Sequence, residues 1–247
     1  MSTQFPSPGF AIAIDGPVAA GKGTIANALA NELHAFNFDT GSMYRALALF
    51  VLRKGIKIPD FEDTTNYDAL IPQVLQVLEE IQIDVKDTNT IFINGENVTE
   101  EIRNEKVTNS TPHVAAIPQV RQEMVKRQRA LIYQRIQSGQ IVIVDARDAG
   151  TVIIPDVIDK YYIWAETEIR AQRRWAQFGR DNGRSQEEVL EEIQIRDKTD
   201  EERAASPLLT KEEAQNQGYM IIDTSHTPVE SAVAKVIADL RSKHDTH

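Results

Sequence analysis

The chain has 247 residues, of which 41% are hydrophobic and 26% are charged, a composition typical of a globular protein with a full apolar core. It contains no cysteine, which excludes a disulfide framework, a thiolate metal site and a thiol nucleophile. The formal net charge of −10 argues against broad, nonspecific binding of nucleic acid. Residues 1–9 lack the features of a signal peptide and no apolar run approaches membrane-spanning length, so we expect a cytoplasmic protein with a disordered N-terminal tail.

The first element in chain order is a short apolar run, residues 11–14, which predicts a buried strand. Three glycines within residues 16–23 then frame a loop whose backbone N–H groups can turn inward, because glycine has no Cβ to clash. Lys22 adds a mobile cation, and residues 25–33 predict a helix with one apolar face. Strand, glycine loop, lysine and helix N-terminus together predict a binding site for a polyphosphate.

The loop departs from the strict Walker A pattern, in which Ser or Thr directly follows the lysine and its hydroxyl reaches magnesium. Here Gly23 intervenes and Thr24 comes one residue later, a form that resembles nucleoside monophosphate kinases more than GTPase switches. We therefore expect Mg²⁺ to be held mainly by phosphate oxygens and water, with no direct protein ligand. The nearest candidate carboxylate is Asp145.

Beyond the loop, strand and helix signals alternate, which is typical of a parallel α/β sheet. The run at residues 141–144 is the most apolar short stretch of the chain and predicts a central buried strand. The further strands are expected at residues 35–39, 161–165 and 219–223.

The alternation is interrupted in the first half of the chain. A polar, turn-rich segment is followed by a predicted helix at residues 67–80 and by an antiparallel hairpin with strands at 81–85 and 90–94. A hairpin inside a parallel α/β chain is most simply an inserted subdomain. The expected division is a tail at 1–9, a core domain at 10–58 and 117–247, and an inserted domain at 59–116.

Residues 166–217, between the last two strands, are polar, helical and rich in arginine, and we expect a lid at about 168–210. Arg196, Asp200 and Arg203 are spaced so that a helix places them on one face. A carboxylate between two guanidiniums orients both, as a transferring phosphoryl group requires. A solvated charged surface explains the other arginines equally well: Arg170, Arg173, Arg174, Arg180 and Arg184.

In an open parallel sheet, ligands bind beyond the carboxyl ends of the strands. The first strand leads into the phosphate loop, the second leads toward Arg45, and the central strand leads toward Arg147. We therefore expect these arginines and several carboxylates to converge on the phosphate loop.

Five ordered motifs identify the family that the chain resembles, from residue 10 to about residue 240. They are GPVAAGKGT, DTGSMYR, VAAIPQVRQEMVKRQR, DARDAGTVIIPD and RDKTDEERAASPL, in the order and spacing of bacterial-type cytidylate kinases. The resemblance implies an α/β fold with a five-stranded parallel P-loop sheet flanked by helices, an inserted α+β monophosphate-binding domain and a helical lid. It also implies a monomer that transfers the γ-phosphoryl group of ATP to CMP or dCMP, with Mg²⁺ carried by ATP and no nucleic-acid or membrane partner.

The resemblance further implies roles for individual residues. ATP binding falls to Gly16, Pro17, Val18, Ala19, Ala20, Gly21, Lys22, Gly23 and Thr24. CMP binding falls to Thr40, Arg45, Thr111, Arg121, Arg147, Asp148, Arg196, Asp200 and Arg203. Catalysis falls to Lys22, Arg147, Arg196 and Arg203. Within the CMP set, Arg121 and Asp148 are the implied cytosine readers.

The chemistry of the base supports this assignment independently. Cytosine presents an N4 amino donor beside the N3 and O2 acceptors, so the Asp148 carboxylate can accept from the amino group while an arginine donates to the acceptors. Uracil would place its O4 against the same carboxylate, and an unpaired polar group in a closed site rejects an analogue strongly. We therefore predict a preference for CMP over UMP.

The chain departs from the family pattern near the base and in the phosphate loop, and also at Ala146 and Ala149, which replace residues that are more often Gly and Met. Pro112 stands where the family commonly has a serine that helps to read the base, and proline offers neither a hydroxyl nor an N–H. Thr111 is the candidate substitute, and relaxed base selectivity stays open. In the phosphate loop, Val18 and Ala19 replace residues that are small or polar in the family.

Three other functions remain open from the sequence. One is a P-loop kinase for another acceptor, such as UMP, AMP or a non-nucleotide like shikimate. Another is a noncatalytic nucleotide-binding switch, although we find no guanine-reading Asn-Lys-x-Asp element. The last is an RNA-binding module that uses the basic helix predicted at residues 118–137.

Overall fold

The computed structural model describes residues 9–58, 67–88, 90–179, 183–202 and 206–244. The chain divides into two compact units. The first unit combines residues 1–37 with 132–247, and the second comprises residues 38–131. The predicted inserted domain, 59–116, falls within the second unit.

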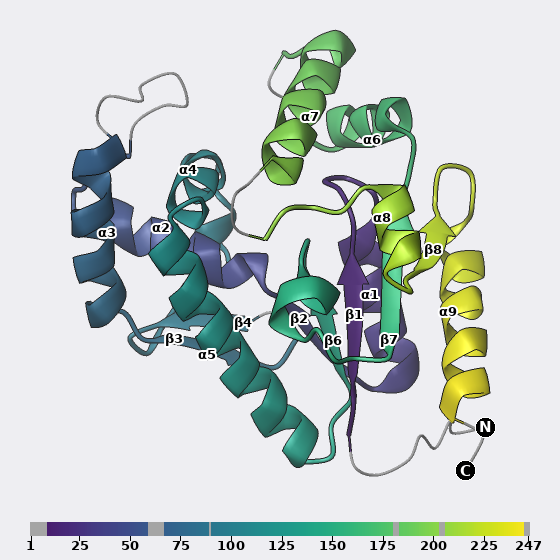
Figure 1. Cartoon of the computed structure of the whole chain (residues 1–247). Coiled ribbons are helices and arrows are strands. Elements are labelled where there is room, and N and C mark those ends of the chain that lie inside the picture. The colour runs from purple at the N-terminus through teal and green to yellow at the C-terminus, as the bar shows by residue number, and fades with distance from the viewer. Residues whose placement is uncertain (1–8, 59–66, 89, 180–182, 203–205, 245–247) are drawn as a thin grey trace. The chain divides into compact units, whose positions relative to one another are not determined.

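A five-stranded sheet in the order β2-β6-β1-β7-β8 forms the centre of the first unit (Figure 1). Its strands are β1 (Ala11–Asp15), β2 (Phe36–Asp39), β6 (Val142–Asp145), β7 (Asp159–Trp164) and β8 (Met220–Asp223). β1 pairs in parallel with both β6 and β7, and β7 pairs in parallel with β8. All five residues of β1 are buried, because the strand has a neighbour on each side and covered faces, which explains its unbroken apolar run. All five predicted strands are confirmed to within two residues.

Two helices pack on this sheet through their apolar faces. α1 (Lys22–Leu33) and α9 (Val229–His244) contact each other and share one buried cluster with β1. Leu29 of α1 and Val236 of α9 are fully buried in this cluster against Ile12. The first strand and the helix that follows the phosphate loop are therefore fixed by the main core of the unit.

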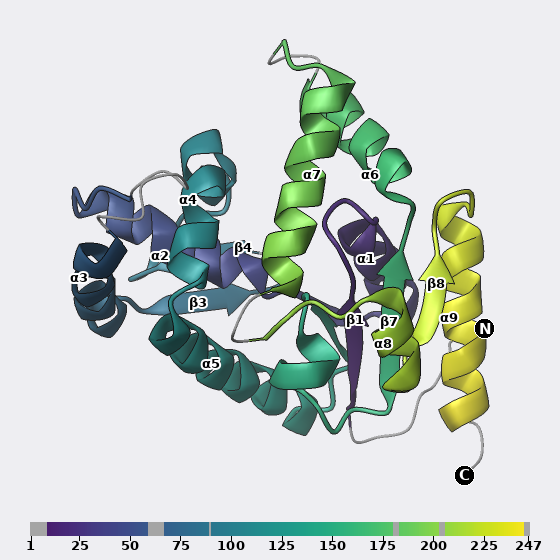
Figure 2. The same ribbon diagram turned by 45° about the horizontal axis from the view of Figure 1, so that its top comes forward.

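A helical hairpin lies beyond the carboxyl ends of β1 and β7 (Figure 2). It consists of α6 (Thr167–Arg174), a π-helical turn η4 (Trp175–Gly179) and α7 (Gln186–Glu201), in the stretch predicted as a lid. α7 begins with a capping box in which Ser185 Oγ accepts from the Glu188 N–H at 3.1 Å and Glu188 Oε2 accepts from the Ser185 N–H at 2.7 Å. A shorter helix, α8 (Lys211–Asn216), packs on β7 and β8.

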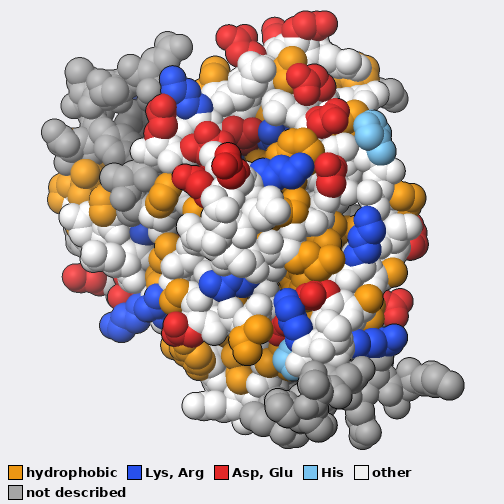
Figure 3. Space-filling view, turned by 45° about the vertical axis from the view of Figure 1, so that its right-hand side comes forward, with side chains coloured by type: hydrophobic (Ala, Val, Ile, Leu, Met, Phe, Trp, Pro, Cys, Tyr) orange, Lys and Arg blue, Asp and Glu red, His pale blue; other side chains and the backbone are white. Residues whose placement is uncertain are grey.

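The outer surface of this hairpin is acidic. Seven of the 16 residues of α7 are Asp or Glu, and acidic side chains gather at the top of the face seen in Figure 3, at the height of α7 in Figure 1. Among the described residues, no helix is long and apolar enough to cross a membrane.

The second unit packs helices around a small antiparallel sheet. Its helices are α2 (Gly41–Arg53), α3 (Tyr67–Glu80), η2 (Glu101–Arg103), α4 (Glu105–Ala115) and most of α5 (Pro118–Gln137). Its sheet has the order β3-β4-β5, with β3 (Ile83–Lys86), β4 (Thr90–Ile93) and β5 (Glu96–Asn97). The helices predicted at 67–80 and 118–137 and the hairpin are confirmed. The sequence analysis missed α4, which is polar and contains Pro112, and the two-residue β5.

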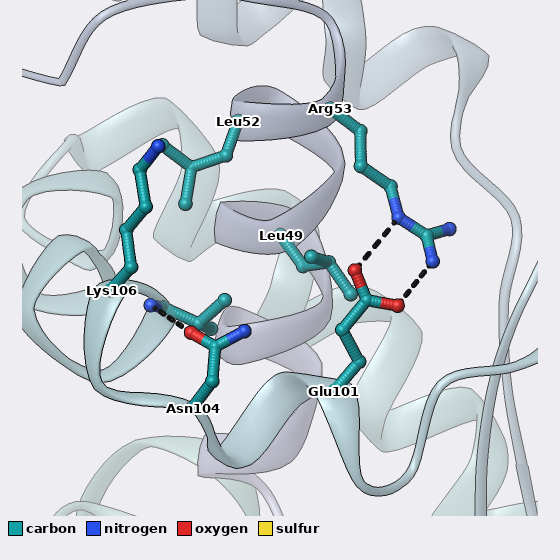
Figure 4. A pocket seen from close by; sticks show the side chains of 7 residues that line it. Leu49, Leu52, Arg53, Glu101, Asn104 and Lys106 are labelled. Atoms are coloured by element: carbon teal, nitrogen blue, oxygen red, sulfur yellow. Dashed lines mark hydrogen bonds and ion pairs between the residues drawn. The ribbon is translucent and has the colours of Figure 1, made fainter.

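Ion pairs hold the surface of the second unit together. The Arg53 guanidinium of α2 binds the carboxylates of Glu96 and Glu101, and Figure 4 shows its contact with Glu101. Asn104 caps α4, since its Oδ1 accepts from the Val107 N–H at 2.8 Å. Both contacts border a shallow pocket that is also lined by Leu49, Leu52 and Lys106.

We expect Gly16→Ala to lower the free energy of unfolding by about 3 kcal/mol or more. Gly16 follows β1 at a φ of +142°, and a Cβ at this position would lie 2.1 Å from the carbonyl oxygen of Ile163 in β7. Gly139→Ala is the matched control, because Gly139 also has a positive φ, +84°, but faces open space. That change should cost only about 1–2 kcal/mol of backbone strain. Urea-induced unfolding measures both, and equal losses would contradict a steric role for the approach of β7.

Candidate active site

The phosphate loop connects β1 to α1, and its carbonyl groups are held by side chains. Lys22 Nζ donates to the Pro17 carbonyl at 2.8 Å, Arg170 Nη1 donates to the Val18 carbonyl at 3.1 Å, and Thr224 Oγ1 donates to the Ala20 carbonyl at 2.8 Å. In a trans peptide the N–H points away from the preceding carbonyl. The N–H groups that follow these three carbonyls therefore turn to the opposite side of the loop.

The first turn of α1 completes this anion-binding geometry. Gly21 forms the N-cap with a φ of +91°. Among the described residues, no side chain caps this end of the helix. The N–H groups of the first turn are therefore available to a ligand, at the positive end of the helix dipole. This is the arrangement that the glycine pattern predicts.

Lys22 lies among charges of both signs. Burial lowers the pKa of its ammonium group to about 8, although the carboxylates of Asp145 and Asp200 act in the opposite direction. The guanidinium of Arg147 lowers the pKa further. At neutral pH the ammonium group is still largely protonated, and an anionic ligand would raise its pKa because an opposite charge favours the charged form.

Two strand ends and the helical hairpin contribute to the same charged cluster. Arg147, just beyond β6, pairs through Nε with Asp200 Oδ2 of α7 at 2.5 Å. Burial by itself lowers the pKa of Arg147, but the charges of Asp200 and Asp145 outweigh this effect and raise it. Asp145 lies against the first turn of α1, since a Cβ on Gly23 would be 3.5 Å from its Oδ2.

The structure gives Asp200 a partner that the sequence did not predict. The spacing places Asp200 between Arg196 and Arg203 on one helix face, and the structure also pairs it with Arg147, a residue distant in sequence. Arg196 is half-buried on α7, and Arg203 lies outside the described residues. Within the first unit, Arg147, which follows a strand end, pairs with the hairpin near Lys22. The convergence of Arg45 on the same loop stays a prediction.

Asp15 is a buried carboxylate to which the sequence analysis assigned no role. Its two oxygens accept hydrogen bonds from the Ala149 N–H at 2.7 Å, the Gly150 N–H at 2.9 Å and the Tyr219 hydroxyl at 2.6 Å. Burial raises the pKa of Asp15 to about 6, although these three hydrogen bonds lower it. The available signal was a carboxylate directly after an entirely apolar strand.

Asp148 is held in place by the segment that Asp15 anchors. It is 5% exposed and precedes the π-helical turn η3 (Ala149–Ile153). Its carbonyl accepts hydrogen bonds from Val152 at 2.9 Å and from Ile153 at 3.1 Å. Single π-helical turns often occur at functional sites.

The second unit holds the other residues that the resemblance assigns to the acceptor. Arg121 of α5 is 6% exposed and lies over the Tyr44 ring, 5.5 Å from its centroid. Arg45 Nη1 donates to Thr108 Oγ1 at 2.8 Å. The Thr111 hydroxyl donates to the Val107 carbonyl of its own helix at 2.7 Å, so its proton is engaged while its lone pairs can still accept. Thr40 is buried.

The described residues contain no group of three or more His, Cys, Asp or Glu side chains that could hold a metal ion. Beside the phosphate loop, the Asp145 carboxylate lies near Gly23 and Lys22 and is a candidate donor. Such a donor fits Mg²⁺, which retains water and is commonly bound through one or two carboxylates together with substrate phosphates.

Comparisons with known proteins agree on one family. A sequence profile described as cytidylate kinase matches residues 12–242. A cytidylate kinase of Caldanaerobacter subterraneus subsp. tengcongensis is 38% identical over 93% of this chain and 94% of its own length. One of Pelotomaculum thermopropionicum is 39% identical over 92% of this chain and 94% of its own length. The crystal structure of TT1252 from Thermus thermophilus covers 94% of this chain and 98% of its own with a TM-score of 0.50; at 17% identity it supports the fold alone.

We expect the Asp15 carboxyl to titrate near pH 6 and Tyr219→Phe to move its midpoint upward, because the hydroxyl donates to the charged form. The folded-state pKa lies above the ordinary value of 3.8. This group therefore stabilises the fold most below pH 3.8 and loses that contribution as the pH rises through about 6. NMR titration of the carboxyl carbon measures the midpoint. Tyr133→Phe, at an exposed tyrosine, is the control and should leave it unchanged; an unmoved midpoint in Tyr219→Phe would contradict the hydrogen bond.

Proposed function

The chain belongs to the cytidylate kinase family, and we propose that it transfers the γ-phosphoryl group of ATP to CMP or dCMP, giving ADP and CDP or dCDP. The observation that carries the proposal is the cluster at the phosphate loop, where Arg147 and Asp200 flank Lys22 within one compact unit. A second phosphate ester beside the triphosphate needs cations supplied by several segments, and this cluster draws on a loop, a strand end and a helix. We further propose a cytoplasmic monomer.

The phosphate loop binds the triphosphate of ATP in this proposal. The N–H groups turned inward by the three held carbonyls, together with those of the first turn of α1, donate to the phosphate oxygens. Lys22 then leaves the Pro17 carbonyl and pairs with the terminal phosphates. Asp145 is the residue that would hold Mg²⁺ through water, and the ion would neutralise the charge of the phosphates.

The reaction needs no nucleophile from the protein. A phosphate oxygen of CMP attacks the γ-phosphorus of ATP, the bond from that phosphorus to the β–γ bridging oxygen breaks, and ADP leaves. Lys22, Arg147, Arg196 and Arg203 offset the charge of a loose transition state, so catalysis is positioning and electrostatic stabilisation. Asp200 fixes the plane of the Arg147 guanidinium for this task.

Base recognition is proposed for Asp148 and Arg121. Asp148 is buried and held by η3, and Arg121 is buried with one guanidinium contact to the Ala115 carbonyl at 3.4 Å and its plane near Tyr44. Immobilised carboxylate and guanidinium groups suit the donor and acceptor pattern of cytosine. Arg45 is proposed to bind the phosphate of the acceptor and Thr40 to lie near its sugar. Thr111 is proposed to replace the serine that helps to read the base in the family.

The first test is a panel of acceptors scored by ADP release. We expect CMP and dCMP to stimulate ADP release strongly, with UMP and AMP far weaker. A better response to UMP, AMP or shikimate would replace the proposed function by that of another P-loop kinase. No stimulation by any acceptor would favour a noncatalytic nucleotide-binding protein.

We expect Arg147→Ala to lower kcat by about 100-fold or more, because a preorganised cation at the transferring group is lost. Arg241→Ala, at an exposed arginine of α9, is the matched control and should leave kcat within about two-fold. Steady-state kinetics with CMP and ATP measure both. Unchanged turnover in Arg147→Ala would remove this arginine from the mechanism.

We expect Asp148→Asn to reduce the preference for CMP over UMP by at least about ten-fold, because an amide can donate to the O4 of uracil where a carboxylate repels it. The ratio of kcat/KM for the two acceptors measures the effect. An unchanged ratio in a folded variant would assign base selection to another residue.

A further inference from the structure

Val18 is an apolar side chain in a loop assigned to polyphosphate binding. It is 9% exposed and belongs to a cluster with Ala171 of α6 and with Val189 and Ile193 of α7. Trp175 packs at the edge of this cluster. The tip of the phosphate loop is therefore part of the small core that joins α6 to α7.

Arg170 makes a second link between the same segments. Its guanidinium is 4% exposed and donates through Nε to the Ala165 carbonyl at 3.0 Å and through Nη1 to the Val18 carbonyl at 3.1 Å. Nη2 donates to Thr167 Oγ1 at 2.9 Å and pairs with Asp197 Oδ2 of α7 at 2.6 Å. One buried side chain thus connects the end of β7, the backbone of the phosphate loop and the second helix of the hairpin.

Asp197 and Asp200 lie on neighbouring positions of one helix face, three residues apart. Asp197 pairs with Arg170 and so with the loop, while Asp200 pairs with Arg147 beyond β6. Through these two ion pairs, α7 positions both the Arg170 guanidinium, which binds the Val18 carbonyl, and the Arg147 guanidinium.

We propose that Val18 and Arg170 form a joint through which the α6–α7 hairpin positions the phosphate loop, so that ATP affinity depends on the contact between Val18 and the hairpin. Both are positioning residues; neither is assigned a step in phosphoryl transfer. The proposal rests on the proposed function in taking residues 16–24 as the ATP phosphate site. It gives Arg170, which the sequence left equally consistent with a surface charge, a specific task.

The test measures ATP binding without any acceptor. The chain has two tryptophans, so a Trp164→Phe parent leaves Trp175 as the reporter beside the joint. Fluorescence titration with ATP and Mg²⁺ gives Kd for the parent and its variants. We expect Val18→Ala and Arg170→Lys each to raise Kd by about 10-fold.

A double-mutant cycle separates a joint from general destabilisation. Ile193→Ala removes the opposite side of the contact, and we expect the double variant with Val18→Ala to bind ATP no more weakly than the worse single variant. Ile237→Ala, which removes the same type of side chain where it packs against the main core at α9, is the control and should lower stability while leaving Kd unchanged. Kinetics should show a larger rise in KM for ATP than in KM for CMP.

Two results would overturn the joint. One is an ATP Kd within two-fold of the parent in Val18→Ala; the other is an additive loss in the double variant. If Arg170→Lys fails to fold, the Val18–Ile193 cycle decides the matter alone. This outcome can be distinguished from a failure of the proposed function. The titration contains no acceptor, so it reports the Kd for ATP even if CMP does not stimulate ADP release.

Discussion

The buried carboxylate of Asp15 fixes the relative positions of the strand ends on which the site is built. It receives two N–H groups from the segment after β6 and a hydroxyl from the residue before β8, and it stands at the end of the central strand β1. A Cβ on Gly150 would lie 2.5 Å from the Tyr219 hydroxyl, so the approach of these segments leaves no space for a side chain. Burial of an unpaired carboxylate would cost free energy, but three hydrogen-bond donors stabilise the Asp15 carboxylate. These hydrogen bonds also link three segments of the chain.

The charged groups of the site are therefore attached to segments that are held rigidly. Arg147 and Asp148 lie between β6 and the segment that Asp15 anchors, and Lys22 lies on the first turn of a helix packed in the main core. Electrostatic stabilisation of a transferring phosphoryl group is effective when the cations do not have to reorganise. The pairing of Arg147 with Asp200 extends this principle to the hairpin, because it orients the guanidinium before any ligand arrives.

Local patterns in the sequence were sufficient for the parallel sheet, for the helix at 67–80 and for the phosphate loop, because apolar runs and glycine spacing reflect local geometry. The helix α4 was not predictable from such patterns, since Pro112 and its polar neighbours argue against a helix and tertiary packing overrides them. The partners of Asp200 and Arg170 could not be predicted from local patterns in the sequence either. Both are decided by segments distant in sequence, and a helix-face argument can pair a residue only with its own helix.

An apolar residue in a phosphate loop conflicts with function only if the loop binds through its side chains. Here the carbonyls of Val18 and Ala20 are held by Arg170 and Thr224, which lie outside the loop, so the backbone N–H groups that follow these carbonyls are available as donors whatever the side chains are. The Val18 side chain is therefore not needed for ligand binding and can pack against α6 and α7. Because burial of Val18 and the carbonyl contact from Arg170 act on the same residue, side-chain packing and backbone orientation at this point of the loop are set together.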